Sequence, residues 1–543
     1  MAIDRRTFIR DSAVLGVAAA AAPVPAGAEA GRPAARGADT PGPFELDELT
    51  VADLQERMAS GRDTAKSLAE KYLARIEQLD ARGPALHSVI EINPEALAIA
   101  EALDGERAKS GPRGPLHGIP VLIKDNIGTA DRMTTTAGSL ALEGSIPAKD
   151  SFVAARLREA GAVILGKTNL SEWANFGSSH SSSGWSGRGG QAKNPYALDR
   201  NPSGSSSGTG VAVAANLVAV GIGTETDGSI TSPAASCGLV GLKPTVGLVS
   251  RSGVVPIAHS QDTAGPMART VSDASVLLGA IAGPDADDAV TKDAPAGGRI
   301  DYTKFLDAAG LKGARIGIPR KGFFGYSHHA DRVAAEAIAI MERLGAVIVD
   351  PVELPDAEEL GKAEYEVLLY EFKADLDAYL ASLGPSAPVK SLRDAIDFNE
   401  RNRDREMPYF EQEIFIEAQA KGPLAEQAYL DALAACRRIS RTEGIDAVMD
   451  KHALDALVAP TSGPPSLTDL VNGESGSGGA TTFPAVAGYP HLTVPGGFVF
   501  GLPVVVSFFG RAWSEPVLLK LAYAFEQATR HRRPPAFLST VVL

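Results

Sequence analysis

The spacing of apolar residues alternates between two periods along the first third of this chain. Helical spacing runs through residues 64–79 and 151–160, whereas short runs rich in β-branched residues lie at 118–125 and from Ala162 onward. We expect the second of these runs to leave the core at Lys167. Helices and strands that alternate in this way predict a largely parallel or mixed sheet covered by helices.

The same alternation continues through the rest of the chain. Residues 210–223 are predicted to form a helix and then a strand, 330–349 a second such pair, and 454–462 a further apolar segment. The C-terminal part predicts two paired strands before a closing helix over 515–529. We therefore expect an α/β protein in which a large twisted mixed β-sheet is covered by helices on both faces, within one compact domain over 44–543.

Two helix starts are marked by residues that suit a helix N-terminus. Thr50 and Asp53 fit a capping box, although Asp stands where Glu or Gln is usual. Asn93 and Pro94 suit the N-cap and first residue of a helix that runs through Ala102. These signals place two helix starts before the first predicted strand.

The N-terminus carries the three parts of an export signal. The segment DRRTFIR at 4–10 holds paired arginines, an apolar run follows at 12–22, and Ala26-Gly27-Ala28 fits a cleavage site. The apolar run is shorter than the ~18 residues that a membrane span needs. We expect a twin-arginine-type signal peptide over 1–28, a disordered lead-in over 29–43, and a periplasmic or secreted protein without a stable membrane anchor.

Charge and composition narrow the classes of function. The 543 residues carry 52 basic and 66 acidic side chains, a formal net charge of −14, and an acidic surface repels phosphate backbones. The nine histidines lack the H-E-x-x-H spacing, and no G-x-x-x-x-G-K-[ST] motif occurs. We expect no nucleic-acid partner, no metal, no cofactor, buried free thiols at Cys237 and Cys436, and a monomer or homodimer.

The stretch NPSGSSSGTG at 201–210 permits three interpretations. A Gly/Ser-rich run is often a flexible linker, but this one lies between two core-like regions, where a functional loop is more usual. Residues 204–208 also fit G-x-S-x-G, the strand-to-helix elbow of α/β-hydrolases, with Ser206 as nucleophile and His491 or His531 as base. The sequence before Ser206 holds two prolines and no β-branched run, so the strand that an elbow requires is missing.

The third interpretation comes from a longer pattern. Together, PSGSSSGTGVAVAANL and GTETDGSITSPAASCGLVGLKPT resemble the signature of the amidase signature family, and the resemblance runs from about residue 45 to 535. It implies that Ser229 is the nucleophile, that Ser205, 24 residues earlier, is the bridging serine on a cis peptide bond, and that Lys124 in LHGIPVLIKDNI is the base. It also implies the amidase signature fold.

These residue types suit hydrolysis of an amide. A serine hydroxyl attacks an amide only when a base takes its proton, and a lysine is a base only when it is neutral. Lys124 ends an apolar strand, so burial is expected to lower its pKa, while its neighbour Asp125 points to the other face. Ser205 would relay the proton between Ser229 and Lys124.

The turn after the strand at 210–223 is expected to form the oxyanion hole. Its donors would be the backbone N–H groups of Thr226, Asp227, Gly228 and Ser229, none of which is proline. Asp227 stands where the family usually has Gly, so we expect its carboxylate to turn away or to be paired. Glu225 replaces the usual Asp, and Thr231 replaces an Arg, which would favour neutral carboxamides over acidic ones.

The segments KTNLSEWANF, GWSGRGGQ and GTETDGSI look closest to the peptide amidase branch of the family. We therefore expect a serine-dependent amide hydrolase that forms an acyl-enzyme and releases ammonia from C-terminally amidated peptides. The alternatives are an aliphatic or aryl acylamidase, a subunit resembling the glutamyl-tRNA(Gln) amidotransferase, and a binding relative that has lost catalysis, although all three triad residues are present. Trp173, Phe176, Trp185 and Ser206 are candidates for the substrate cleft, and aromatics at this spacing are as often core residues.

Overall fold

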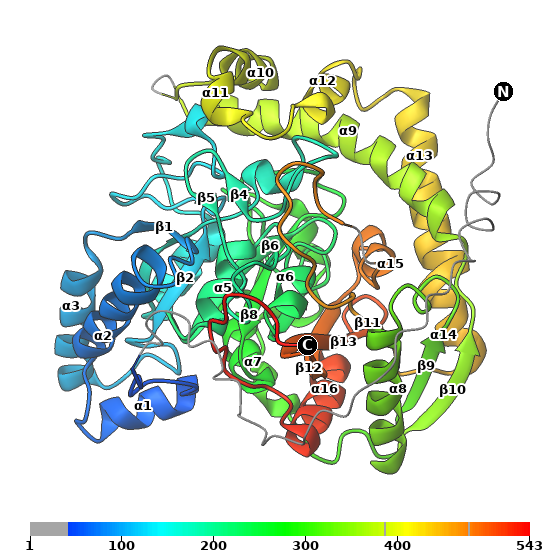
Figure 1. Ribbon diagram of the computed structural model, residues 1–543, viewed down its shortest axis with the longest axis horizontal. Coiled ribbons are helices and arrows are strands. Elements are labelled where there is room, and N and C mark those ends of the chain that lie inside the picture. The colour runs from blue at the N-terminus through cyan, green and yellow to red at the C-terminus, as the bar shows by residue number, and fades with distance from the viewer. Residues whose placement is uncertain (1–41, 385–386, 476–477) are drawn as a thin grey trace, which may run out of the picture. The chain divides into compact units, whose positions relative to one another are not determined.

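The computed structural model describes residues 42–384, 387–475 and 478–543, and an eleven-stranded mixed sheet runs through them (Figure 1). The pairs β2–β3, β2–β6, β9–β10 and β9–β11 are parallel, and the others are antiparallel. The order across the sheet is β1 (Val89–Ile92), β3 (Val163–Thr168), β2 (Pro120–Lys124), β6 (Val220–Glu225), β8 (Thr263–Ala268), β7 (Val240–Lys243), β12 (His491–Val499), β13 (Leu502–Phe509), β11 (Ala456–Pro460), β9 (Arg315–Pro319) and β10 (Val347–Val352). A separate hairpin pairs β4 (Trp185–Ser186) with β5 (Gly190–Gln191).

Helices cover both faces of this sheet, as the sequence predicted. Helices α5 and α6 contact each other on one face, and α7 and α16 contact each other on the opposite face. The helices that precede β10 along the chain are α1 (Val51–Ala59), α2 (Ala65–Ile76), α3 (Ala96–Ser110), α4 (Phe152–Glu159), α5 (Ser207–Ala214), α6 (Thr231–Ser236), α7 (Val271–Ile281) and α8 (His328–Arg343). The last helix of the chain is α16 (Glu515–Thr529).

Glycines at paired positions let α5 and α6 lie close to the sheet. Gly221 and Gly241 both pair with Met267, so the three residues share one face. A Cβ atom at Gly221 would lie 2.6 Å from Thr209 of α5, and one at Gly241 would lie 2.6 Å from Ala234 of α6. Only glycine permits this approach, which brings the start of α5 against β6.

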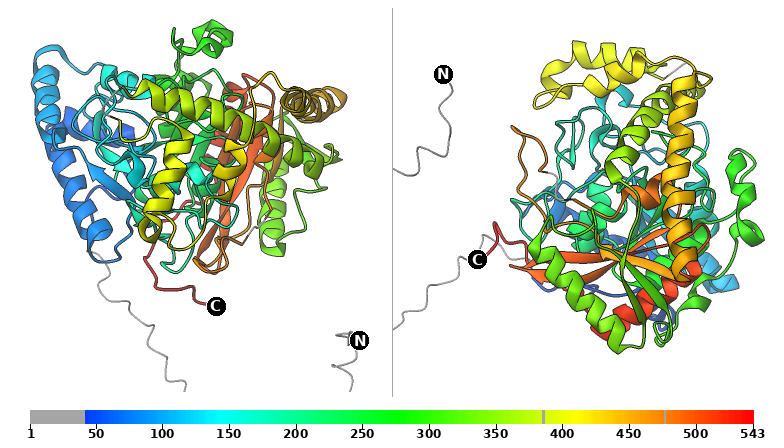
Figure 2. Two further views of the ribbon diagram at one scale, coloured as in Figure 1. Left: turned by 90° about the horizontal axis from the view of Figure 1, so that it is seen from above. Right: turned by 90° about the vertical axis from the view of Figure 1, so that its right-hand side faces the viewer.

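Between β10 and β11 the chain forms a group of helices at one side of the sheet. The long helix α9 contacts α10, α12, α13 and α15, and Figure 2 shows this group from two further sides. Its members are α9 (Ala357–Ser382), α10 (Leu392–Arg401), α11 (Arg403–Glu406), α12 (Glu413–Gln419), α13 (Gln427–Arg437) and α14 (Asp446–His452), and α15 (Thr482–Val486) follows β11.

Several predicted boundaries are confirmed and two are wrong. Thr50 and Asp53 form the capping box, and α16 spans the predicted residues. Helix α3 begins at Ala96 with Glu95 as N-cap, later than predicted. Asn93 still bonds to the helix start, because its Oδ1 accepts from the Glu95 N–H at 2.9 Å while its amide donates to the Ile164 carbonyl. The helix also continues past Ala102 to its end at Ser110.

Lys167 is the second correction. Its side chain was expected to leave the core, yet it is fully buried, because its ammonium group finds acceptors inside the protein. The predicted signal peptide over 1–28 and all but the last two residues of the lead-in over 29–43 lie outside the described residues. Within the described part of the chain, the helices are too short or too polar to cross a membrane.

Candidate active site

Lys124 ends strand β2 inside the protein, and its side chain faces hydroxyl groups. Its Nζ donates to Ser205 Oγ at 2.7 Å and to Thr224 Oγ1 at 2.9 Å, and the Thr224 carbonyl oxygen lies at 3.4 Å. The side chain is fully buried. Burial lowers the pKa of Lys124 from 10.5 to about 7, and the Asp262 and Glu225 carboxylates oppose part of this change. A lysine with this pKa is partly neutral near pH 7.

The neighbouring carboxylate of Asp125 points away from Lys124. Asp125 Oδ2 accepts hydrogen bonds from the Thr136 hydroxyl and from the Gly138 N–H at 3.4 Å, and Arg188 lies 3.6 Å away. The expectation that adjacent residues on this strand face opposite sides is therefore confirmed. Asp125 gives Lys124 no direct counter-charge.

The stretch at 201–210 forms a loop and then the first residues of α5. The peptide bond between Gly204 and Ser205 is cis, and the described residues 201–206 contain no strand. Ser206 Oγ donates to the Thr224 carbonyl at 3.0 Å, and its N–H donates to the Ser229 carbonyl at 3.0 Å. Ser206 thus joins the loop to β6 and to the residues after it, and the elbow interpretation lacks its strand.

One of the two histidines that the elbow interpretation offers as a base, His491, is placed elsewhere. His491 is fully buried on β12, where its Nε2 lies 2.5 Å from Ser507 Oγ. Burial lowers the pKa of His491 to about 3. Its nearest hydroxyl partner is therefore Ser507 and not Ser206.

We call residues Thr226–Ser229 the catalytic loop; they turn sharply after β6. Gly228 has a φ of +76°, which favours glycine, and its carbonyl accepts from the Ser232 N–H at 2.7 Å. Within the described residues, the N–H groups of the loop donate to no other protein atom. Four such donors in one turn can together face an oxygen that gains negative charge.

The Asp227 side chain is paired, as expected for a carboxylate at this position. Its Oδ2 accepts from Thr482 Oγ1 at 2.8 Å, whereas its buried Oδ1 has no hydrogen-bond partner among the described residues. Burial raises the pKa of Asp227. The carboxyl group is thereby directed toward α15.

Sequence comparison places this geometry in a known family. The Amidase family model matches residues 67–519, which is more than half of the chain. The chain belongs to the amidase signature family. It is 45% identical over 508 residues to a probable amidase of Arabidopsis thaliana, covering 91% of this chain and 93% of that protein. It is also 36% identical to a glutamyl-tRNA(Gln) amidotransferase subunit of Myxococcus xanthus, covering 89% and 98%.

Solved structures give the same assignment. The native peptide amidase from Stenotrophomonas maltophilia is 52% identical, with a TM-score of 0.88 over 91% of this chain and all of that chain. An amidase family protein from Bacillus anthracis is 37% identical, with a TM-score of 0.81 over 90% and 93%. The protein is therefore an amide-hydrolysing enzyme with the amidase signature fold.

Two departures of this amidase from the usual family sequence meet in one contact. Glu225 Oε2 accepts from the Ile230 N–H at 2.8 Å, from the Thr231 N–H at 2.9 Å and from Thr231 Oγ1 at 3.1 Å. Thr231 is fully buried. The longer Glu225 side chain and the hydroxyl of Thr231 together fix the chain on both sides of Ser229.

The three aromatic cleft candidates are largely buried in this amidase. Trp173 and Phe176 belong to a hydrophobic cluster beneath α9, and Trp173 packs edge-on against Phe415. Trp185 packs edge-on against Tyr409 and Phe410. These contacts favour a structural role, and their place in a substrate cleft stays a prediction.

Sequence reasoning missed several polar residues that contact the candidate site. Thr224 contacts Lys124 directly, Asp262 Oδ1 accepts from Thr226 Oγ1 at 2.6 Å, and Gln261 Nε2 donates to the Thr226 carbonyl at 3.3 Å. Gln261 and Asp262 precede β8, and a polar pair directly before a buried strand is the signal that would have indicated them. The contact between Gln261 and Glu364 of α9 joins residues 103 positions apart, and no local pattern marks it.

Proposed function

We propose that this amidase releases ammonia from the C-terminal carboxamide of peptides through an acyl-enzyme on Ser229. The observation that carries the proposal is the buried contact of 2.7 Å between Lys124 Nζ and Ser205 Oγ. The N–H of Ser206, the residue after Ser205, donates to the Ser229 carbonyl, which holds Ser229 beside this pair. A neutral Lys124 accepts a proton from Ser205, and Ser205 accepts one from Ser229. The Ser229 oxygen then attacks the amide carbon.

The tetrahedral intermediate carries its negative charge on the former carbonyl oxygen. N–H groups of the catalytic loop bind that oxygen, and a donor of this kind contributes about 10²–10³ in rate. The C–N bond breaks as the nitrogen takes a proton from Ser205, which Lys124 replaces, and ammonia leaves. A water molecule then loses a proton along the same path, attacks the ester of Ser229 and frees the carboxylic acid.

The substrate class is supported by similarity to the peptide amidase from Stenotrophomonas maltophilia at 52% identity. A peptide amidase that is likewise 52% identical has been solved in complex with the competitive inhibitor chymostatin. Thr231 supplies no cation near the catalytic loop, which suits neutral carboxamides. An aliphatic or aryl acylamidase is the alternative within the same family.

A role as an amidotransferase subunit is the second alternative, because the Myxococcus xanthus subunit is 36% identical. The net charge of −14 opposes contact with tRNA. The twin-arginine-type sequence at 4–10 supports work in the periplasm or outside the cell, away from charged tRNA. We propose that location for the mature enzyme, with a peptide or small amide as its only required partner.

The first test measures ammonia release by the purified protein and by its Ser229→Ala and Ser206→Ala variants. The substrates are a C-terminally amidated dipeptide, an aryl acylamide and L-glutamine. We expect release from the dipeptide amide, loss of at least about 10³-fold in Ser229→Ala, and only a partial loss in Ser206→Ala, because Ser206 acts through hydrogen bonds to Thr224 and Ser229.

Other outcomes separate the alternatives. Full activity of Ser229→Ala with a dead Ser206→Ala would restore the elbow interpretation. Preference for the aryl acylamide would move the enzyme to the acylamidase branch, and release from glutamine alone would favour the amidotransferase relationship.

A further inference from the structure

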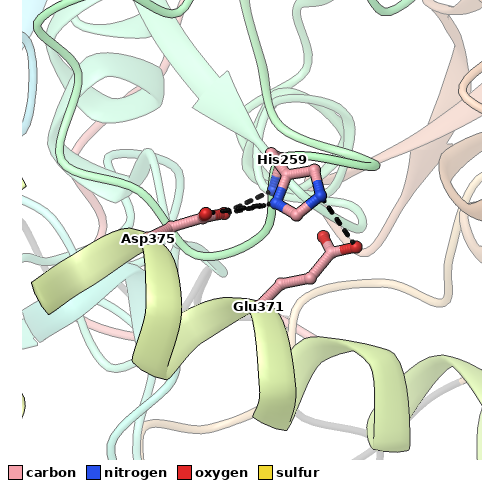
Figure 3. A group of neighbouring side chains, drawn as sticks. All are labelled: His259, Glu371 and Asp375. Carbon is pink, nitrogen blue, oxygen red and sulfur yellow. Dashed lines mark hydrogen bonds and ion pairs between the residues drawn. The ribbon is translucent and has the colours of Figure 1, made fainter. Parts of the chain in front are cut away.

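A loop before β8 is attached to helix α9 through His259. Its Nδ1 lies 2.9 Å from Asp375 Oδ2, and its Nε2 lies 3.4 Å from Glu371 Oε1, on the opposite edge of the ring (Figure 3). The His259 N–H also donates to Asp375 at 2.9 Å. Each ring nitrogen thus faces its own carboxylate. The arrangement is that of an imidazolium held on both sides.

The two loop residues after His259 continue this attachment along the same helix. The Ser260 N–H donates to Glu371 Oε2 at 2.9 Å, and Gln261 Nε2 donates to Glu364 Oε1 at 2.8 Å. Positions 364, 371 and 375 are separated by seven and four residues, so they share one helix face. Three consecutive loop residues therefore meet three acids on the face of α9.

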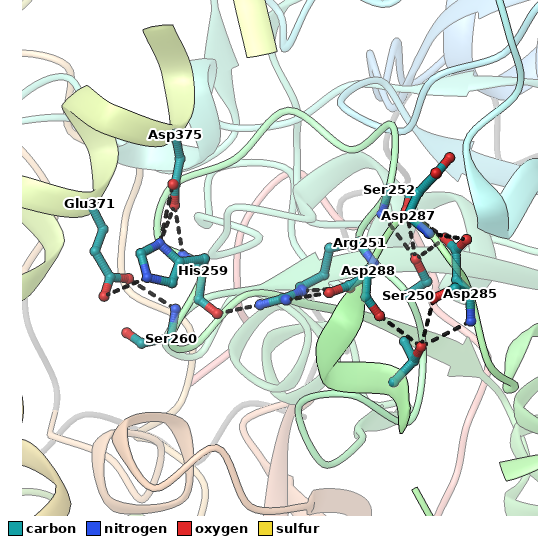
Figure 4. Close-up of polar contacts among 11 residues, drawn as sticks. Ser250, Arg251, Ser252, His259, Ser260, Asp285, Asp287, Asp288, Glu371 and Asp375 are labelled. Carbon is teal, nitrogen blue, oxygen red and sulfur yellow. Dashed lines mark hydrogen bonds and ion pairs between the residues drawn. The ribbon is translucent and has the colours of Figure 1, made fainter. Parts of the chain in front are cut away.

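The other end of the loop is fixed independently of α9. Arg251 donates to both oxygens of Asp288, at 2.6 and 2.9 Å, and to the His259 carbonyl (Figure 4). Ser250 and Ser252 both donate to Asp285. These contacts hold the first residues of the loop in place.

The loop ends at two residues that hold the catalytic loop. Gln261 Nε2 donates to the Thr226 carbonyl at 3.3 Å, and Asp262 Oδ1 accepts from Thr226 Oγ1 at 2.6 Å. Asp262 Oδ2 accepts from the Ile257 and Ala258 N–H groups, which orients that carboxylate. Thr226, whose N–H begins the proposed oxyanion hole, is thereby held at its backbone and its side chain.

We propose that Gln261, oriented by Glu364 of α9, is a positioning residue for amide hydrolysis that sets the direction of the oxyanion-hole donors. The proposal rests on the proposed function. Rotation of the peptide unit between Thr226 and Asp227 turns the Asp227 N–H, because the carbonyl and that N–H belong to one planar group. The hydrogen bond from Gln261 to the Thr226 carbonyl therefore fixes the orientation of a donor directly.

Burial beside a second carboxyl favours the neutral form of Glu364. Its side chain is 7% exposed, and burial together with the nearby Asp227 carboxyl raises its pKa well above the ordinary value. A neutral carboxyl still accepts the hydrogen bond from Gln261 while placing no full charge beside the developing oxyanion. Glutamine has the same shape and keeps the acceptor oxygen, so Glu364→Gln should preserve the function that Glu364→Leu removes.

The test compares full-length Gln261→Met, Glu364→Leu and Glu364→Gln with the wild type on a dipeptide amide. We expect Gln261→Met and Glu364→Leu to lower kcat by about tenfold to a hundredfold with KM within about twofold, because a small misplacement of catalytic groups costs rate more than binding. Glu364→Gln should restore most of the activity. Affinity for a peptidyl aldehyde, whose adduct places an oxyanion in the hole, should fall in parallel with kcat.

Gln412→Met is the matched control. Gln412 is a buried glutamine at 3% exposure, whose Nε2 donates to the Ile396 carbonyl at 3.2 Å and to Glu400 at 3.1 Å, away from the catalytic loop. It should lose stability without losing kcat per folded molecule. If Gln261→Met fails to fold, Glu364→Leu carries the same test.

The inference fails if Gln261→Met and Glu364→Leu keep kcat within about twofold, or lose it only in proportion to the folded fraction, as Gln412→Met does. It also fails if Glu364→Gln is as slow as Glu364→Leu. Absence of amidase activity in the wild type, or full activity in Ser229→Ala, would instead overturn the proposed function on which the inference rests.

Discussion

Lys124 and Lys167 lie on neighbouring parallel strands, and both side chains are fully buried. Burial lowers the pKa of Lys124 to about 7 and that of Lys167 to about 8. The pKa values therefore do not separate a catalytic base from a structural lysine in this enzyme. The groups that surround each ammonium do.

The ammonium group of Lys167 is surrounded mainly by carbonyl oxygens, which can only accept hydrogen bonds. Its Nζ donates to the Ile127 carbonyl at 2.8 Å, to the Thr134 carbonyl at 3.1 Å and to Thr135 Oγ1 at 2.9 Å. A neutral amine has two N–H bonds, so loss of a proton would leave one of these acceptors unpaired. Lys167 is thus stabilised as a donor that joins two loop segments to β3.

The amine of Lys124 is surrounded mainly by hydroxyl groups, which can either donate or accept a hydrogen bond. Ser205 and Thr224 offer hydroxyls at 2.7 and 2.9 Å, and the only carbonyl contact among the described residues is longer, at 3.4 Å. A hydroxyl can donate to the lone pair of a neutral amine as readily as it accepts from an ammonium. Proton transfer at Lys124 therefore leaves no partner unsatisfied.

Replacing each lysine by methionine gives the largest expected difference. Lys124→Met should lower kcat/KM by about 10³-fold or more, because it removes the base, with little change in stability. Lys167→Met should keep the kcat of the folded enzyme and lower the free energy of unfolding by about 2 kcal/mol, because buried carbonyls lose their donor. Ammonia release and urea unfolding measure the two effects.

The distinction between the two lysines would be wrong if Lys124→Met lost stability and Lys167→Met lost activity. Activity in Lys124→Met within tenfold of wild type would exclude it as the base. A Lys167→Met enzyme that unfolds at the wild-type urea concentration but loses kcat would give Lys167 the catalytic role.

The sequence could identify one of these lysines and not the other. Lys124 lies in LHGIPVLIKDNI, which the family resemblance marks, and Ser229 lies in GTETDGSI, a separate segment of the same resemblance. Lys167 also ends an apolar run, and a lysine there usually reaches solvent. The carbonyls that hold it belong to residues 127 and 134, and no local pattern reports where such backbone groups lie.

The pH dependence should follow Lys124. Its pKa of about 7 means that the protonated, inactive form dominates at lower pH, so kcat/KM should fall about tenfold per unit below pH 7 and level off above it. Lys167→Met should keep this profile. Circular dichroism over the same pH range establishes that the protein stays folded.

A profile that is flat between about pH 5 and 8 would contradict Lys124 as the titrating base. A profile that moves in Lys167→Met while the fold is intact would show that the two lysines titrate together.

The same limit on sequence reasoning applies to the loop that meets α9. The fold class and the helices and strands with clear periodic apolar spacing could be predicted, because that spacing lies within each segment, whereas α7 and the helices from α9 to α15 were not predicted. Gln261 and Glu364 lie 103 residues apart, and their contact depends on how α9 packs against the loop before β8. Residues of this kind are found from packing and not from spacing.

The smallest expected effect comes from removing one hydroxyl beside each lysine. Thr224→Val keeps the side-chain shape but removes the hydroxyl that contacts Lys124 and accepts from Asn126 Nδ2 at 2.9 Å. Thr135→Val makes the same change beside Lys167. We expect Thr224→Val to lower kcat about tenfold, because the Lys124 amine loses one of the groups that direct it toward Ser205.

Thr135→Val should leave kcat unchanged and lower the free energy of unfolding by about 1 kcal/mol, the net value of one hydrogen bond. Two carbonyls still orient Lys167 after this change, whereas Thr224→Val leaves Lys124 with Ser205 and one distant carbonyl. Steady-state kinetics measure kcat of both variants, and urea titrations measure their free energy of unfolding. Equal losses of kcat in the two variants would mean that hydroxyl contacts matter only for packing, and the distinction between the lysines would then rest on Ser205 alone.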